Sequence, residues 1–292
     1  MSVTSPLSWA KPLVVSSFAL VTTIIAVESA CAVSIFGINN TTKKFTVDSA
    51  ESSLQTNNVA VVSNNNTNIY IGTNQISSDN QNPIITSFTN GERDWVFSDI
   101  ETTGADSRGV ALLWDGNNQL YAAFTTDGTQ GLVTEDFRRF TQNGWLDSYG
   151  QGGGAKATVL LKIELDKIDP DNPNNTTGVI NNGTFVYARL DSGNTNTLVP
   201  SNMYFLGTDI VLEAQSFFSP LDINKNQMVQ TIPSQSPFDY TITFDNNLIE
   251  AKDAVSPGWN ETLAVPFGFK PSMGLIISLI ALSVPTILKK VK

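Results

Sequence analysis

The stretch GVALLWDGNNQLYAAFTTDG, residues 109–128, shows the fold class most clearly. Two runs of apolar and aromatic residues flank the polar quartet Asp115-Gly116-Asn117-Asn118. An Asp-Gly or Asn-Gly pair between two such runs is a strong short-range signal for a β-hairpin. The stretch therefore predicts two antiparallel strands joined by a tight turn at residues 115–118.

Similar patterns recur along the chain. One short helix is expected around Thr134–Arg139. Further strands or hairpins are expected within residues 58–75, 156–166, 183–196, 202–218 and 238–247. The prediction for residues 33–262 is thus one all-β domain.

A repeat accompanies these strands. A polar turn followed by a strand occurs in residues 66–74, 117–126 and 207–216, with steps of roughly 45–50 residues, which is the period of β-propeller blades. Residues 111–128 resemble a blade of bacterial surface propellers built from SBBP repeats. The expected fold is a propeller-like repeat of about four to five blades, and a β-sandwich or jelly roll is the alternative.

Composition excludes several classes of function. The chain has 292 residues and a formal net charge of −10, and it contains no basic stripe of the kind that binds nucleic acid. It contains no histidine, which excludes a Ser-His-Asp triad and the commonest zinc ligand. Its single cysteine, Cys31, cannot form an internal disulfide. These features favour binding over catalysis.

The N-terminus has the pattern of a secretory signal. Lys11 is the only charged residue before Glu28, and Leu13–Val27 is a mostly apolar run. The small residues Ala30 and Ala32 flank Cys31 as in a cleavage site. We predict a signal peptide at residues 1–32, cleaved after Ala32. A buried core helix and a lipoprotein acylated at Cys31 are the alternatives.

The C-terminus has the pattern of a membrane anchor. Met273–Leu288 is apolar but shorter than the roughly 20 residues that span a bilayer, and an extension back to Val265 supplies the missing length. Basic residues after an apolar segment face the cytoplasm. We therefore predict an anchor at residues 263–292 with a basic stop at Lys289, Lys290 and Lys292. The alternative is an amphipathic helix packed on the domain.

The same tail carries a family resemblance. Residues 265–290 resemble PEP-CTERM sorting tails, in their Pro-Phe-Glu variant, through Val265-Pro266-Phe267-Gly268-Phe269, the apolar run and the basic end. The resemblance implies export, recognition by an exosortase-type enzyme, and delivery to the cell surface or extracellular matrix of a Gram-negative-type bacterium. Two features depart from the family: Gly268 replaces the usual Glu, and the basic end uses lysine where arginine is commoner.

Two acidic segments raise the question of calcium. The EF-hand pattern needs Gly at its sixth position and Glu at its twelfth, and the second segment has Gln227 and Pro233 there. Asx turns explain both segments as well. No other cofactor is expected. The oxygen-bearing residues concerned are Asp166, Asp169 and Asp171 in the first segment, and Asp222, Asn224 and Asn226 in the second.

Aromatic residues are candidates for sugar contact. Trp95, Trp114, Trp145 and Trp259 could stack on saccharides, although aromatic residues within hairpins are usually core. Trp145 lies in the most loop-like context, and we predict that it is exposed and contacts a ligand.

The predicted function is that of an exported, surface-anchored structural or adhesive protein without catalysis, whose partner is a surface polysaccharide or another surface protein. One alternative is an exported glycoside hydrolase that uses a pair of carboxylates about 5–10 Å apart. The other is a propeller that binds a ligand at the mouth of its central channel.

Overall fold

The computed structural model describes residues 33–36, 42–165 and 178–260, all within the unit that spans residues 31–292. Strands dominate, and the few helices are short. The elements are β1 Val33–Phe36, α1 Glu51–Thr56, β2 Ala60–Asn64, β3 Thr67–Ser77, β4 Asn80–Thr89, β5 Glu92–Phe97, β6 Ser107–Trp114, β7 Gln119–Thr126, η2 Val133–Glu135, α2 Arg138–Thr141, β8 Ala157–Glu164, β9 Val179–Val186, β10 Ala188–Arg189, β11 Thr195–Asn196, β12 Leu198–Leu206, β13 Asp209–Ser216, β14 Val229–Gln230, β15 Phe238–Phe244, β16 Ala251–Val255 and β17 Trp259–Asn260.

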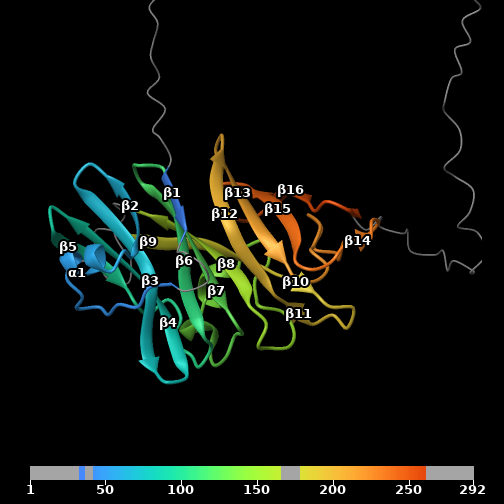
Figure 1. The fold of residues 1–292 in the computed structure, drawn as a ribbon, viewed down its shortest axis with the longest axis horizontal. Helices are drawn as coiled ribbons and strands as arrows, with labels where there is room; N and C mark the ends of the chain where they lie inside the picture. Colours follow the sequence, from blue (N-terminus) through green and yellow to red (C-terminus); the bar gives the residue numbers. More distant parts are fainter. Residues whose placement is uncertain (1–32, 37–41, 166–177, 261–292) are drawn as a thin grey trace, which may run out of the picture. The chain divides into compact units, whose positions relative to one another are not determined.

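Three antiparallel meanders organise these strands (Figure 1). The first is the sheet β2-β3-β4-β5, and the last is the sheet β12-β13-β15-β16. Between them in the sequence, β6-β7-β8-β9 form a meander that β1 extends by pairing with β6. The short strands β10 and β11, and β14 and β17, form two-stranded ribbons. The prediction of an all-β domain is confirmed.

The hairpin predicted at residues 115–118 is confirmed as the β6–β7 turn. Asp115 Oδ1 accepts hydrogen bonds from the backbone N–H groups of Asn117 and Gln119, at 2.7 and 3.1 Å. Gly116 adopts φ +78°, a conformation that a residue with a Cβ rarely adopts. The predicted hairpins β2–β3 and β12–β13 are also present. Local turn chemistry therefore decides these connections.

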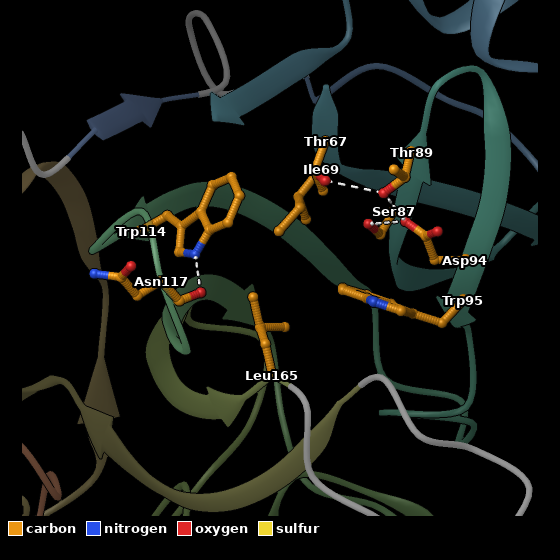
Figure 2. Close-up of a pocket in the computed structure, with 9 residues that line it drawn as sticks. All are labelled: Thr67, Ile69, Ser87, Thr89, Asp94, Trp95, Trp114, Asn117 and Leu165. Carbon is orange, nitrogen blue, oxygen red and sulfur yellow. Dashed lines mark hydrogen bonds between the residues drawn. The ribbon is translucent and has the colours of Figure 1, made fainter. Parts of the chain in front are cut away.

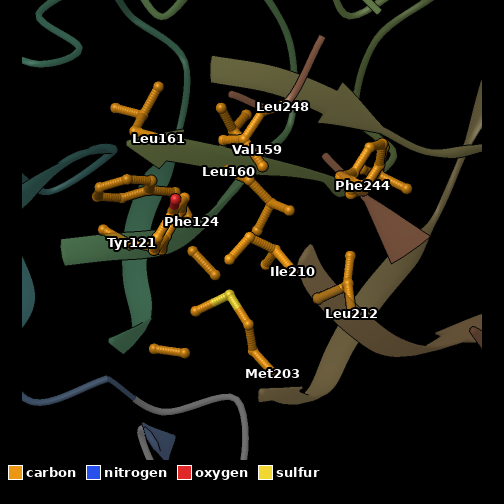
Figure 3. Packing of buried hydrophobic residues seen from close by; sticks show 14 of the residues in the cluster. Tyr121, Phe124, Val159, Leu160, Leu161, Met203, Ile210, Leu212, Phe244 and Leu248 are labelled. Carbon is orange, nitrogen blue, oxygen red and sulfur yellow. The ribbon is translucent and has the colours of Figure 1, made fainter. Parts of the chain in front are cut away.

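The middle meander is buried on both faces. Every residue of β7 except Gln119, and every residue of β8 except Glu164, is buried. Both neighbouring meanders and the segment before α2 contribute to this burial. β3 and β4 contact β6, and β12 contacts β6 and β8. The Phe137 ring packs against Phe124 of β7 and Phe185 of β9. Figure 3 shows Leu160 of β8 in the same hydrophobic core as Ile210 and Leu212 of β13. A strand covered on both faces needs apolar residues at successive positions, as β7 and β8 have.

Hydrogen bonds join the middle meander to the loop after β15. The Tyr121 hydroxyl donates to the Asn246 carbonyl oxygen at 2.8 Å. Lys162 Nζ donates to Asn247 Oδ1 at 2.9 Å, although the Lys162 side chain is buried. These bonds satisfy polar groups that would otherwise be costly to bury.

A smaller hydrophobic cluster lies under α1, which the sequence patterns did not predict. It contains Phe45, Leu54, Val59, Tyr70, Ile84 and Phe88. Glu51, in the first turn of α1, accepts hydrogen bonds from Asn68 Nδ2 at 2.7 Å and from the Tyr70 hydroxyl at 3.0 Å. The helix is therefore held to β3 by both apolar and polar contacts.

The outcome differs between the predicted short helix, the individual strands and the propeller. The helix expected around Thr134–Arg139 is present as the short turns η2 and α2. The strands β4, β5 and β16 were not predicted. A propeller is not confirmed, because no sheet among the described strands closes into a ring.

Candidate binding pocket

A pocket of about 250 Å³ lies between the first meander and the β6–β7 turn (Figure 2). Polar side chains occupy one part of its wall and aromatic and aliphatic side chains the rest. Its lining residues are Thr67, Ile69, Ser87, Thr89, Asp94, Trp95, Trp114, Asn117 and Leu165. This volume lies below the roughly 300–1,000 Å³ of pockets for drug-sized ligands, so it suits a group of about one sugar ring.

A β-bulge places the only carboxylate in this described lining. The Asn90-Gly91 turn has positive φ at both residues, +55° and +85°, as a type I′ turn requires. Along β4 and β5, Phe88 pairs with Arg93 but Ser87 pairs with Trp95, which leaves Asp94 as the extra residue. A bulge redirects side chains locally. Here it brings Asp94 beside side chains of β4.

Hydroxyl groups hold the Asp94 carboxylate. Ser87 Oγ and Thr89 Oγ1 donate to Asp94 Oδ2 at 2.8 and 2.9 Å. Since the Thr89 proton is used there, Thr67 is the donor in the 2.9 Å contact between the two threonine hydroxyls. Among the described residues no group donates to Asp94 Oδ1. That oxygen can therefore accept a hydrogen bond from a ligand.

Two tryptophans form the apolar walls. Figure 2 shows Trp95 and Trp114 on opposite sides of the pocket, with Ile69 and Leu165 between them. Trp114 Nε1 donates to the Asn117 carbonyl oxygen at 2.9 Å, which fixes its ring against the β6–β7 turn. Trp95 packs against Phe97, with ring centroids 4.9 Å apart. The pocket thus combines rigid aromatic surfaces with one carboxylate.

The prediction that Trp145 is exposed is wrong. Its side chain is only 2% exposed. Trp145 Nε1 donates to the Ile223 carbonyl oxygen at 2.9 Å, and its ring packs edge-on against Phe244 with centroids 5.7 Å apart. The backbone N–H of Trp145 donates to the Leu248 carbonyl oxygen at 3.0 Å. Distant loops therefore bury the residue, although its own segment is irregular.

Asp222 organises a turn. It is fully buried, and its Oδ1 accepts from the backbone N–H groups of Asn224 and Asn226, both at 2.9 Å. This is the Asx-turn alternative, with Lys225 at φ +69°. Within the described ranges no group of three or more Cys, Asp or Glu side chains is arranged to hold a metal ion. The other candidates, Asp166, Asp169 and Asp171, lie outside the described residues.

The residues predicted at the two ends also lie outside the described part of the chain. They are Ala30 and Ala32 of the cleavage site, Val265, Pro266, Phe267, Gly268 and Phe269 of the sorting motif, and the basic residues Lys289, Lys290 and Lys292. Among the helices that the structure describes, none has both the length and the apolar character needed to cross a membrane.

The sequence indicated Trp95 and Trp114 as candidates for sugar contact, but it did not indicate Asp94, Ser87 or Thr89. A signal was available, because Asn90-Gly91 predicts a hairpin and would have placed Thr89 beside Glu92. The bulge at Asp94 has no comparable signal, so the direction of its carboxylate comes only from the structure.

Comparison with protein-family models, with curated proteins and with solved structures finds no match to this chain. The features that bear on function are therefore the residues of the pocket and the sequence of the two ends.

Proposed function

We propose that the protein is an exported, surface-anchored binding protein that holds a saccharide group in the Asp94 pocket without catalysis. The observation that carries the proposal is the combination of the Asp94 carboxylate with the rings of Trp95 and Trp114, which lie on opposite sides of the pocket. A sugar ring has apolar C–H faces that pack on aromatic rings and hydroxyls that donate to a carboxylate. The partner is accordingly a surface polysaccharide, and another surface protein is the alternative.

Binding is favoured over hydrolysis by the composition of the pocket. Glycoside hydrolysis normally needs two carboxyl groups about 5–10 Å apart. The described lining contains one, Asp94. Two of the neighbouring hydroxyls are donors to that carboxylate, so they position it and do not supply a second acid.

The location follows from the sequence of the ends. Residues 1–32 have the pattern of a signal peptide, and residues 263–292 that of a sorting tail and anchor. We propose that an exosortase-type enzyme processes the tail, so that the domain stays at the cell surface or is released to the extracellular matrix. Intact masses of the protein from membranes and from medium test this. Loss of residues 1–32 with a break near Pro266 is expected, and a mass that retains Lys292 only in membranes would contradict processing.

The finer fold that we propose is a propeller-like row of meanders. Three consecutive four-stranded meanders support it, and so does the middle sheet, whose two faces are covered as the faces of a blade are. A β-sandwich remains the alternative. An experimental structure that includes residues 166–177 and 261–292 would distinguish the two.

Titration calorimetry of the full chain in detergent micelles tests saccharide binding. A panel of neutral saccharides is titrated into the native chain, Asp94→Asn and Asp48→Asn. Loss of a charge-assisted hydrogen bond should weaken binding at least about tenfold in Asp94→Asn. Asp48→Asn removes the same charge at an exposed position outside the pocket and should bind like the native chain. Equal affinities of the two variants would contradict the proposal, and release of reducing sugar would favour the hydrolase.

A further inference from the structure

One segment beside the last described strand, β17, is exposed at every position and contains no charged residue. From Val229 to Pro237 every residue is exposed and none is charged. Val229 is 54% exposed and Ile232 is 65% exposed, which are high values for aliphatic side chains. Phe217, 41% exposed, adjoins the segment, because Ser236 Oγ donates to its carbonyl oxygen at 3.1 Å.

This segment is fixed to the last described strand. Val229 pairs with Asn260 in the ribbon of β14 and β17. The backbone N–H groups of Thr231 and Ile232 both donate to the Gly258 carbonyl oxygen, at 2.7 and 3.0 Å. Met228, just before the ribbon, is buried and anchors it to the domain. We call residues 229–237 with β17 the exit ribbon.

The chain leaves the exit ribbon toward its apolar tail. Residues 261–264 separate Asn260 from Val265, where the segment long enough to span a bilayer begins. Fully extended, that connection spans at most about 18 Å. If the segment is embedded in a bilayer and the tail has not been cleaved, the exit ribbon therefore lies within reach of the same bilayer surface.

We infer that, before the tail is cleaved, the exit ribbon rests on the membrane surface, with Ile232 and Val229 inserted among the lipids at the interface. The inference rests on the proposed anchoring of the tail. The absence of charge matters, because apolar side chains gain by leaving water while an inserted charge would be costly. A charged side chain would have to lose its water to enter the interface, and residues 229–237 contain no charged side chain. The partner is a lipid surface, and no particular headgroup is required.

Lipid-dependent fluorescence quenching tests the inference. The full chain, with Cys31→Ser to remove its only cysteine, receives Ile232→Cys and a bimane label. It is reconstituted at one chain per phosphatidylcholine nanodisc that contains lipid with a doxyl quencher near the headgroup. Ile76→Cys is the matched control, because Ile76 is 53% exposed and lies on β3 of another sheet. Quenching at position 232 should exceed quenching at position 76 at least twofold.

The outcomes separate this inference from the anchoring on which it rests. Flotation of the chain with vesicles reports anchoring alone. Chains that float but show equal, weak quenching at both positions would overturn the inference and leave the anchor intact. Chains that neither float nor show quenching would overturn both. Disulfide-linked dimers of the unlabelled Ile232→Cys variant in vesicles, without quenching in single-chain discs, would assign the ribbon to a second copy of the chain and also overturn the inference.

Discussion

Gly109 of β6 lies against the backbone of Gly72 of β3. A Cβ at position 109 would stand 2.9 Å from the Gly72 carbonyl oxygen, and it would also meet the Ile71 side chain. This close approach joins the first meander to the second, and the pocket that contains Asp94 lies between these two meanders. The missing side chain at Gly109 is therefore a packing requirement.

Replacement of Gly109 by alanine should destabilise the domain. The added methyl group forces backbone or Ile71 to move, and overpacking of this kind typically costs about 1–3 kcal/mol. Urea unfolding followed by circular dichroism measures the change. Gly128→Ala is the matched control, because a Cβ there meets nothing within 4 Å. Equal stability of the two variants would contradict the close approach of the two sheets.

Truncation of Trp145 should cost far more stability than its loop setting suggests. Trp145→Ala removes a buried ring and its contact with Phe244, for an expected loss of about 3–5 kcal/mol. Trp145→Phe keeps most of the ring and leaves the Ile223 carbonyl oxygen without its donor, so it should cost less. Chemical unfolding measures both. A loss below 1 kcal/mol in Trp145→Ala would mean that the side chain is exposed.

Glu101 should make stability depend on pH. It is fully buried, and its Oε2 has no hydrogen-bond partner among the described residues. Burial raises the pKa of the Glu101 carboxyl, hydrogen bonds from Thr103 partly oppose this, and the nearby Asp136 carboxylate raises the pKa further.

The sign follows from the proton balance. In the unfolded chain the pKa of Glu101 is about 4.3. The folded chain retains the Glu101 proton at pH values where the unfolded chain has lost it. The stability due to this carboxyl is therefore fully present below about pH 4.3 and is lost as pH rises through the folded-state pKa. Glu101→Gln should remove this loss, so its Tm should rise relative to the native chain between acidic and neutral pH. Scanning calorimetry measures it. Glu92→Gln, at an exposed position, is the control, and parallel Tm curves for all three proteins would refute the assignment.

The Asp222 carboxylate should stabilise the domain by accepting hydrogen bonds within the turn at residues 222–226. Asp222→Ala leaves the backbone N–H groups of Asn224 and Asn226 without their buried acceptor, which should cost about 1–3 kcal/mol. Asp222→Asn keeps an Oδ1 acceptor and should cost less. Thermal unfolding of both variants, with calcium and with chelator, measures this. If calcium raises the Tm of the native chain but not the Tm of either variant, Asp222 binds the metal instead.

The hairpins follow directly from local sequence. Asp115 and Gly116 specify the β6–β7 turn because the side chain of one and the φ of the other act within four residues. The apolar runs Leu120–Phe124 of β7 and Val159–Leu161 of β8 likewise indicate burial, although they do not say what covers each face. The same local chemistry at Asn90-Gly91 could have revealed β4 and β5.

The pocket that contains Asp94 depends on contacts between residues far apart in the chain. Trp114 and Asp94 line one cavity because a bulge shifts the register of β5 and because Gly109 lets two sheets approach closely. Trp145 is held in the interior by hydrogen bonds to the carbonyl oxygens of Ile223 and Leu248. No sequence pattern around residue 145 indicates these partners. Turn type and strand periodicity are short-range properties and can be predicted from adjacent residues. Burial and the meeting of side chains depend on how distant segments pack, so they became known only with the three-dimensional structure.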